Sequence, residues 1–191
     1  MTNDLIIAGV DEVGRGPLVG SVVTAACILP ASFDLPGLTD SKKISEKKRE
    51  TLCELIKEQA VAYAIAESSA KEVDQINVLQ ASLLAMRRAV EKLSIQPDFV
   101  LVDGNRLPNW QYEAKAIVGG DKKEPAISAA SILAKGYRDQ QMIELAQQYP
   151  DYGFEQHKGY PTKKHIEAIQ LHGVLDEHRK SFAPVKNFLG L

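Results

Sequence analysis

Three short apolar segments of the chain each run into acidic residues. The segments are Leu5–Val10, Phe99–Val102 and Lys115–Val118, and the acidic residues after them are Asp11, Glu12, Asp103 and Asp121. Apolar runs of this length, stopped by glycine or an acidic residue, are typical of strands buried in a sheet. In α/β proteins, functional sites usually gather where such strands end. The sequence therefore predicts that these carboxylates lie together, provided that the strands are neighbours.

Carboxylates that converge at strand ends suit a narrow range of chemistry. They are partly desolvated and repel one another, which raises their pKa values unless a cation joins them. Oxygen atoms of Asp and Glu are the ligands that Mg²⁺ and Mn²⁺ prefer. Four of them can hold the two metal ions of a phosphoryl-transfer site. Each residue taken alone is equally well explained as a turn residue, as the dipeptide Asp103-Gly104 illustrates.

The order of the apolar patterns predicts a mixed sheet in an α/β fold. Leu5–Val10 and Val19–Leu29, joined by Gly14–Pro17, indicate an antiparallel hairpin. Later strands alternate with helices, which is the pattern of a sheet covered by helices. Val61–Glu67 is predicted as a further strand. The predicted helices are Lys47–Glu58 with Ser45 as N-cap, a short helix at the capping box Ser69–Glu72, an amphipathic helix through Leu79–Leu93, a long helix over 126–148, and a last helix from Thr162 to Gly173.

Length and composition restrict the class of protein. The 191 residues, 45% hydrophobic and 25% charged, fit one globular domain. No apolar run approaches the roughly 20 residues of a membrane-spanning helix, and the first residues do not resemble a secretory signal. Cys27 and Cys53 lie in apolar surroundings without CxxC spacing, which indicates small buried residues in a reducing compartment. We expect a cytoplasmic monomer that does not bind membranes.

The distribution of charge says more than the net charge of −2, which gives no general indication of nucleic-acid binding. Basic residues gather after Tyr152 and in a second cluster formed by Lys42, Lys43, Lys47, Lys48 and Arg49. A solvated helix face is the common explanation of such clusters. Basic patches on an acidic body also suit a protein that holds metal ions and contacts a phosphate backbone. The four histidines after Tyr152 match no common zinc motif.

The segment Gly14-Arg15-Gly16 invites a nucleotide-loop interpretation. Its spacing to Gly20 is GxGxxxG, which is neither the dinucleotide fingerprint nor a Walker loop. Two glycines around an arginine allow another backbone to approach closely. From these residues alone, a surface for a nucleic-acid strand and a plain hairpin turn are equally good explanations.

Taken together, the motifs of the chain resemble the signature of ribonuclease HII. In order they are Gly9–Pro17, Asp40–Lys43, Leu101–Asn105, Gly120-Asp121, Ser128–Lys135, Arg138-Asp139, His157–Tyr160 and Ser181–Val185. The resemblance implies an RNase H-like fold, with a mixed five-stranded sheet flanked by helices and a helical C-terminal extension. It implies one domain over 1–191, with the core to about residue 150 and the extension over about 151–191.

The same resemblance implies an activity and a metal site. The enzyme would cut the RNA strand of RNA/DNA hybrids, and would also incise 5′ of single ribonucleotides in duplex DNA, leaving 5′-phosphate and 3′-hydroxyl ends. Two Mg²⁺ or Mn²⁺ ions would be bound by four catalytic carboxylates, with Asp11 bridging the ions. By resemblance these residues are Asp11, Glu12, Asp103 and Asp121.

Further residues would bind the substrate. By resemblance, the loop of Gly14, Arg15 and Gly16 would sense the ribose 2′-OH, the group that distinguishes RNA from DNA, and Tyr160 would stack on the sugar at the RNA–DNA junction. Phosphate contacts are expected from Lys42, Lys43, Ser128 and Ser131. Structural roles stay open for some residues: Ser128 as a helix cap, Ser131 as a packing residue, and Lys135 as the partner of an internal carboxylate.

The chain departs from the family pattern at four positions. Val19 and Ser21 replace the more frequent alanine and proline of the hairpin, and Gly119 stands where a lysine often precedes Gly-Asp. Gly136 lies inside the long helix, where glycine costs roughly 1 kcal/mol against alanine; either close packing or a weakened helix would explain it.

Two other classes of function compete with the nuclease. A catalytically weak module that only binds RNA–DNA junctions is disfavoured by the four intact carboxylates. Another nuclease of the same fold, such as a junction resolvase, would need no 2′-OH sensor. The apolar tail Lys186–Leu191 matches a sliding-clamp peptide poorly, so a clamp partner is a weaker expectation.

Overall fold

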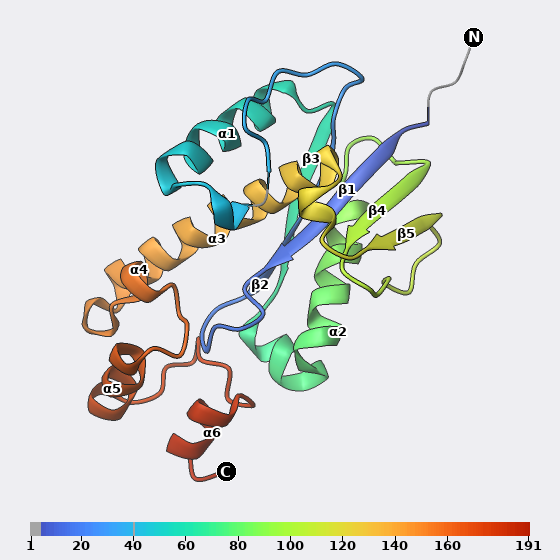
Figure 1. Ribbon diagram of the computed structural model, residues 1–191. Coiled ribbons are helices and arrows are strands. Elements are labelled where there is room, and N and C mark those ends of the chain that lie inside the picture. Colours follow the sequence, from blue (N-terminus) through green and yellow to red (C-terminus); the bar gives the residue numbers. More distant parts are fainter. Residues whose placement is uncertain (1–4, 40) are drawn as a thin grey trace.

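In the computed structural model, which describes residues 5–39 and 41–191, a five-stranded mixed sheet forms the centre of the molecule (Figure 1). The strands are β1 (Ile7–Val13), β2 (Val22–Ile28), β3 (Ala62–Ser68), β4 (Phe99–Asp103) and β5 (Ala114–Ile117). Their order in the sheet is β3-β2-β1-β4-β5. β1 pairs antiparallel with β2 and parallel with β4, and β5 adds a second parallel pair. This is the predicted RNase H-like sheet, hairpin first and parallel strands later.

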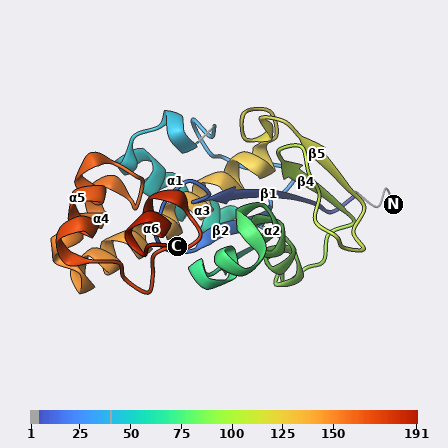
Figure 2. The same cartoon turned by 90° about the horizontal axis from the view of Figure 1, so that it is seen from below.

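Helices cover both faces of the sheet (Figure 2). α2 (Ala70–Glu91) lies on one face, and α1 (Glu46–Gln59) and α3 (Pro125–Gln148) lie on the other. β2 is buried along its whole length. Because side chains alternate along a strand, Ala26 and Ile28 join the core under α2, whereas Ala25 and Cys27 join the core under α1 and α3.

Three helices begin at the capping residues that the sequence predicts. The Ser45 hydroxyl accepts the Lys48 N–H at 3.3 Å and begins α1. The capping box of Ser69 and Glu72 begins α2. The predicted division into two helices is confirmed, because Asn77 interrupts α2 with a φ of 68°. Its side-chain oxygen accepts two backbone N–H groups of the next turn, at 3.0 and 3.1 Å, and so caps the second half.

Residues 150–191 form a small helical layer at the carboxyl end of β1 (Figure 1). Its elements are η3 (Pro150–Tyr152), α4 (Phe154–His157), α5 (Lys163–His172) and α6 (Ala183–Phe188). They enclose a separate apolar core with Leu18, Val19 and Met142. Thr162 caps α5 as predicted, and its hydroxyl accepts the His165 N–H at 3.2 Å.

Several sequence expectations need correction. β1 does not stop before the acidic pair, since Asp11 pairs with Ala25 and the ladder continues to Val13. His157, expected in a loop, is the last residue of α4. Arg49, expected on a solvated face, is buried. The short elements η1 (Ser41–Lys43) and η2 (Gly120–Lys122), together with α4 and α6, were not expected, because one or two turns show no apolar period.

Other expectations about packing are confirmed. Cys27 and Cys53 are buried free thiols, and burial raises the pKa of Cys27 to about 12. A Cβ added to Gly136 would lie 3.1 Å from the sulfur of Cys53, so this glycine lets α1 and α3 approach closely. Trp110 packs edge-on against Tyr112, and both rings pack against the apolar core under α2. Among the described helices, none is long and apolar enough to cross a membrane.

Candidate active site

Asp11 and Asp103 lie at the same level on neighbouring parallel strands. Val10 of β1 pairs with Val102 of β4, and each aspartate is the next residue of its strand. The two valines face α2, so the alternation of side chains turns both aspartates toward α3. Strands in a sheet lie about 4.8 Å apart. The parallel pairing therefore brings together two carboxylates that are far apart in sequence.

Asp121 is held beside Asp103 by the turn that carries it. Its backbone N–H donates to Asp103 Oδ1 at 3.3 Å. The preceding residue, Gly120, leaves the space for this approach, since an added Cβ would lie 3.4 Å from Asp103 Oδ1 and 2.6 Å from Ile127 Cδ1. The hydroxyl of Ser128 donates to the Asp121 carbonyl at 2.7 Å. The start of α3 thus fixes the η2 turn against the end of β4.

Burial and mutual repulsion act on the carboxylates of β1. The pKa of Asp11 is raised well above its usual value, first by burial and then by the charges of Glu12 and Asp103. Hydrogen bonds from Ser131 and from the Glu12 N–H, the latter at 2.7 Å, partly oppose this shift. The pKa of Glu12 is also raised, mainly by burial and also by Asp103, while Arg15 opposes the shift. The carboxylates of Asp11, Glu12 and Asp103 are therefore close enough for their charges to repel one another.

Glu12 lies on the α2 side of β1. It lines a cleft of about 250 Å³ together with Arg15, Asp103 and Arg106. Glu12 Oε1 lies 3.5 Å from Arg15 Nη1, whereas Oε2 is buried and accepts no hydrogen bond from the described part of the chain. A buried carboxylate oxygen without a donor is costly, and a cation would satisfy it.

These features fit a divalent metal ion, although the side chains are not gathered as a closed ligand shell. Within 5–39 and 41–191, no three Asp, Glu, His or Cys side chains are close enough to bind one ion as they stand. The chemistry of the donors nevertheless suits a hard cation, since all are carboxylates. A divalent ion would relieve the repulsion that raises the pKa of Asp11 and would occupy the orphan Glu12 oxygen.

The glycine–arginine loop after β1 lies against Tyr160. A Cβ added to Gly16 would lie 3.3 Å from Tyr160 Cε1. Tyr160 is 43% exposed, so it is available on the surface beside the loop. The Leu18 N–H donates to the Gly159 carbonyl at 2.8 Å and ties the two segments together. Residues expected to contact one substrate are thus neighbours, although about 140 residues separate them in sequence.

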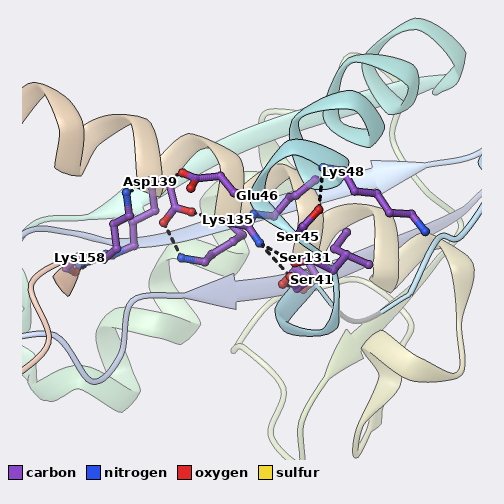
Figure 3. A network of polar contacts seen from close by, with 11 residues as sticks. Ser41, Ser45, Glu46, Lys48, Ser131, Lys135, Asp139 and Lys158 are labelled. Atoms are coloured by element: carbon purple, nitrogen blue, oxygen red, sulfur yellow. Dashed lines mark hydrogen bonds and ion pairs between the residues drawn. The ribbon is translucent and has the colours of Figure 1, made fainter. Parts of the chain in front are cut away.

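The residues expected to contact phosphates differ in their exposure. Ser131 is buried and shares a 2.9 Å hydrogen bond with Ser41 (Figure 3). Ser128 is buried under η2, with the internal hydrogen bond described above. Lys43 is exposed at the end of η1. Asp40 and the side chain of Lys42 lie outside the described residues. Both serines therefore support the carboxylates, and direct substrate contacts of these four positions stay predictions.

A buried ionic network near this site was missed from the sequence. Asp139 accepts a hydrogen bond from Arg49 Nη2 at 3.1 Å. It also pairs with Lys135 (Figure 3). Arg49 also donates to the Ser41 carbonyl at 3.1 Å. The open question about Lys135 is thus decided in favour of an internal carboxylate. The network joins α1, η1 and α3 behind Ser131.

Two buried arginines, Arg138 and Arg179, were also missed. Both side chains donate to the backbone of the loop after β1. The sequence signals for Arg138 are its place in the motif Arg138-Asp139 and its position on α3 four residues from Ala134 and from Met142, both of which are buried. No local pattern singles out Arg179.

Comparison with known proteins decides the family. The sequence profile described as Ribonuclease HII matches residues 8–185. The chain belongs to the ribonuclease HII family. Within that family, ribonuclease HII of Vibrio vulnificus is 59% identical over 185 residues, which cover 97% of this chain and 89% of that protein. Membership makes the chain an endoribonuclease with ribonuclease H activity on RNA/DNA hybrids.

Solved structures agree with the ribonuclease HII assignment. Ribonuclease H2 from Pyrococcus horikoshii OT3 superposes with a TM-score of 0.79 and 25% identity, covering 95% of this chain and 96% of that chain. Bst-RNase HIII, crystallised in complex with Mn²⁺, shares the fold with a TM-score of 0.67 and 17% identity, covering 97% of this chain and 70% of that chain.

Proposed function

We propose that this ribonuclease HII incises DNA duplexes on the 5′ side of single embedded ribonucleotides, in addition to cutting RNA/DNA hybrids. The products carry a 5′-phosphate and a 3′-hydroxyl. The observation that carries the proposal is the packing of Tyr160 against Gly16, at the end of the strand that holds Asp11 and Glu12. This arrangement places a surface that can recognise one sugar beside the group of carboxylates.

The four carboxylates are the proposed ligands of Mg²⁺ or Mn²⁺. They are Asp11, Glu12, Asp103 and Asp121. The raised pKa values of Asp11 and Glu12 and the orphan oxygen of Glu12 support this assignment, as does the Mn²⁺ bound by Bst-RNase HIII. When bound by these residues, two such ions would supply electrostatic activation of the attacking water and of the leaving 3′ oxygen. Ser131 and Ser128 orient the carboxylates by holding Asp11 and the backbone of Asp121.

The proposed substrate path runs from the carboxylates to Tyr160. Gly14, Arg15 and Gly16 present backbone groups to the ribose, and the 2′-OH is the group that they read. The exposed ring of Tyr160 stacks on the neighbouring sugar. Lys42 and Lys43 contact phosphates farther along the substrate. Ser128 and Ser131 lie in the first two turns of α3, the end of the helix that faces the phosphate backbone of the substrate.

The test uses a DNA duplex with one embedded ribonucleotide, incubated with Mg²⁺, Mn²⁺ or EDTA. We expect a metal-dependent cut 5′ of the ribonucleotide that is lost in Asp11→Asn. Cleavage of long hybrids alone would leave the family activity intact and refute the recognition of single ribonucleotides. Binding of both substrates without cleavage would instead favour the binding-module hypothesis.

A contact with a sliding clamp is a separate proposal. The end of α6 and the residues after it expose Phe188, Leu189 and Leu191. A ribonuclease HII of Archaeoglobus fulgidus has been solved as a complex with the clamp PCNA. Deleting residues 187–191 should weaken binding to immobilised clamp and leave hybrid cleavage unchanged. Unaltered clamp binding would refute this contact.

A further inference from the structure

Arg179 is completely buried behind the loop that follows β1. Its guanidinium donates to four backbone carbonyls of this loop: Gly14 at 2.6 Å, Pro17 at 2.8 Å, Gly20 at 2.9 Å and Arg15 at 3.0 Å. One planar group therefore holds the loop at both ends and in the middle. The backbone of Arg179 adds a fifth link, since its N–H donates to Leu18 at 2.7 Å.

The burial of this cation is costly. Among the described residues, no carboxylate lies within ion-pairing distance of Arg179; its other partner is the Phe182 ring, 5.2 Å away. Desolvation lowers the pKa of Arg179 to about 9, so it stays charged at neutral pH. A buried charge without an ionic partner is unfavourable unless hydrogen bonds satisfy it. Here carbonyl dipoles do so, and their arrangement depends on the shape of the loop.

Arg138 connects the same loop to the segment before Tyr160. It donates to the Val19 carbonyl at 3.1 Å and to the Lys158 carbonyl at 2.9 Å. It also lies under Gly14, where an added Cβ would be only 2.3 Å from Arg138 Nε. The loop and the Tyr160 segment therefore share one buried hydrogen-bonded support.

We propose that Arg179 is a positioning residue for ribonucleotide recognition, because it fixes the backbone of Gly14–Gly16 in the shape that meets the ribose. The inference rests on the proposed reading of the 2′-OH by that loop. Glycine-containing loops are conformationally free. Their backbone groups can therefore distinguish ribose from deoxyribose only if another part of the protein fixes the shape of the loop. The rigid guanidinium fork does this at a low entropy cost.

The dependence on Arg179 should differ between substrates. A long hybrid presents a 2′-OH at every position and an A-form shape along its length. A DNA duplex with one ribonucleotide presents a single 2′-OH, so recognition depends on one loop in one position. Loosening the loop should therefore reduce incision at single ribonucleotides more than cleavage of hybrids.

The experiment compares kcat/KM of Arg179→Lys on both substrates. We expect a loss of about 10- to 100-fold at the single ribonucleotide, the effect of losing one or two charge-assisted hydrogen bonds, and less than about 5-fold on the hybrid. Arg88→Lys is the matched control: Arg88 also donates to a carbonyl, that of Glu67 at 2.9 Å, but lies on α2 away from the loop. This variant should keep the wild-type ratio.

Two further measurements separate positioning from general damage. Hydrogen exchange of the amides over 14–20 should accelerate in Arg179→Lys while β2 stays protected. If Arg179→Lys does not fold, Phe182→Leu is tested instead, because it keeps the guanidinium and removes the ring beside it. This variant should lose incision at the single ribonucleotide selectively, by a smaller factor of about 2- to 5-fold. Equal loss on both substrates, or unchanged exchange of the loop, overturns the inference. Failure of the proposed function shows separately, as wild-type enzyme that does not incise at the single ribonucleotide.

Discussion

The ring of Tyr160 lies so close to Gly16 that an added Cβ would be 3.3 Å from its Cε1 atom. This spacing is tighter than ordinary van der Waals contact, so alanine at position 16 must displace the ring slightly. Gly16→Ala should therefore reduce incision at a single ribonucleotide by about 10-fold, since small misplacements of a positioning group have effects of this size. Stability should change by less than about 1 kcal/mol. Initial rates and thermal unfolding check both expectations.

A double-mutant cycle tests whether this effect acts through the ring. In a Tyr160→Ala background, Gly16→Ala should cost nothing further. An undiminished second loss would show that Gly16 acts on the substrate without Tyr160.

Tyr160→Ala removes the proposed stacking surface. Because Tyr160 is 43% exposed, truncation should leave the fold intact and reduce single-ribonucleotide incision by about 10- to 100-fold, the value of one stacking contact. Tyr160→Phe keeps the ring and should retain most activity. A loss in Tyr160→Ala that is equal on long hybrids would contradict a role at the junction.

Asp11→Asn removes one of the mutually repelling charges beside Glu12 and Asp103. Cleavage should fall more than 100-fold, since even outer-shell partners of metal ligands cost about 10- to 100-fold when mutated. Without metal the variant should be at least as stable as wild type, because the repulsion is relieved. Mg²⁺ should raise the Tm of wild type and raise that of the variant much less. Equal Mg²⁺ shifts would argue against Asp11 as a ligand.

The local part of this architecture could be predicted from the sequence. Ser45, Ser69 and Thr162 begin the expected helices because a cap is a contact within four residues. The convergence of Asp11 with Asp103 was conditional on neighbouring strands. It became an expectation only through the family resemblance, because the register of β1 against β4 is set by contacts far apart in sequence.

The supporting residues could not be predicted in this way. Arginine is rarely fully buried, so the sequence favours a solvated helix face for the cluster that contains Arg49 and indicates no role for Arg179. Arg49 pairs with Asp139, which is 90 residues away, and Arg179 donates to the Gly14 carbonyl, which is 165 residues away. No local pattern indicates partners this distant in sequence. Short helices such as α4 and α6 were missed because their burial depends on the loop around Leu18 and Val19.

Asp139 is expected to be a large stabilising contributor. It lies between Arg49 and Lys135, and its side chain is nearly inaccessible. Removing one partner of a buried ion pair typically costs about 3–5 kcal/mol, so Asp139→Asn should lower the free energy of unfolding by that order. The exposed pair of Lys163 and Glu167, 3.7 Å apart, is the control, because Glu167→Gln should cost less than about 1 kcal/mol. Denaturant unfolding of both variants checks the difference.

The histidines behind Tyr160 should make stability depend on pH. His165 Nε2 lies 3.1 Å from His178 Nε2. His165 Nδ1 donates to the Tyr160 carbonyl, and His178 Nδ1 accepts the Leu175 N–H. With these partners, only one proton fits between the two rings. Burial, with repulsion from a neighbouring histidine, lowers the pKa of both to about 4, below the usual value of about 6.5.

The unfolded chain therefore binds more protons than the folded chain between about pH 6.5 and pH 4. Stability should be full above this window and fall as the pH drops through it, by up to about 1.4 kcal/mol per pH unit for each histidine. Thermal unfolding of wild type and of His178→Gln from pH 7.5 to pH 4.5 measures the effect. His172→Gln is the control, because His172 is exposed on α5. Equal pH slopes in wild type and His178→Gln would show that this pair is not the source.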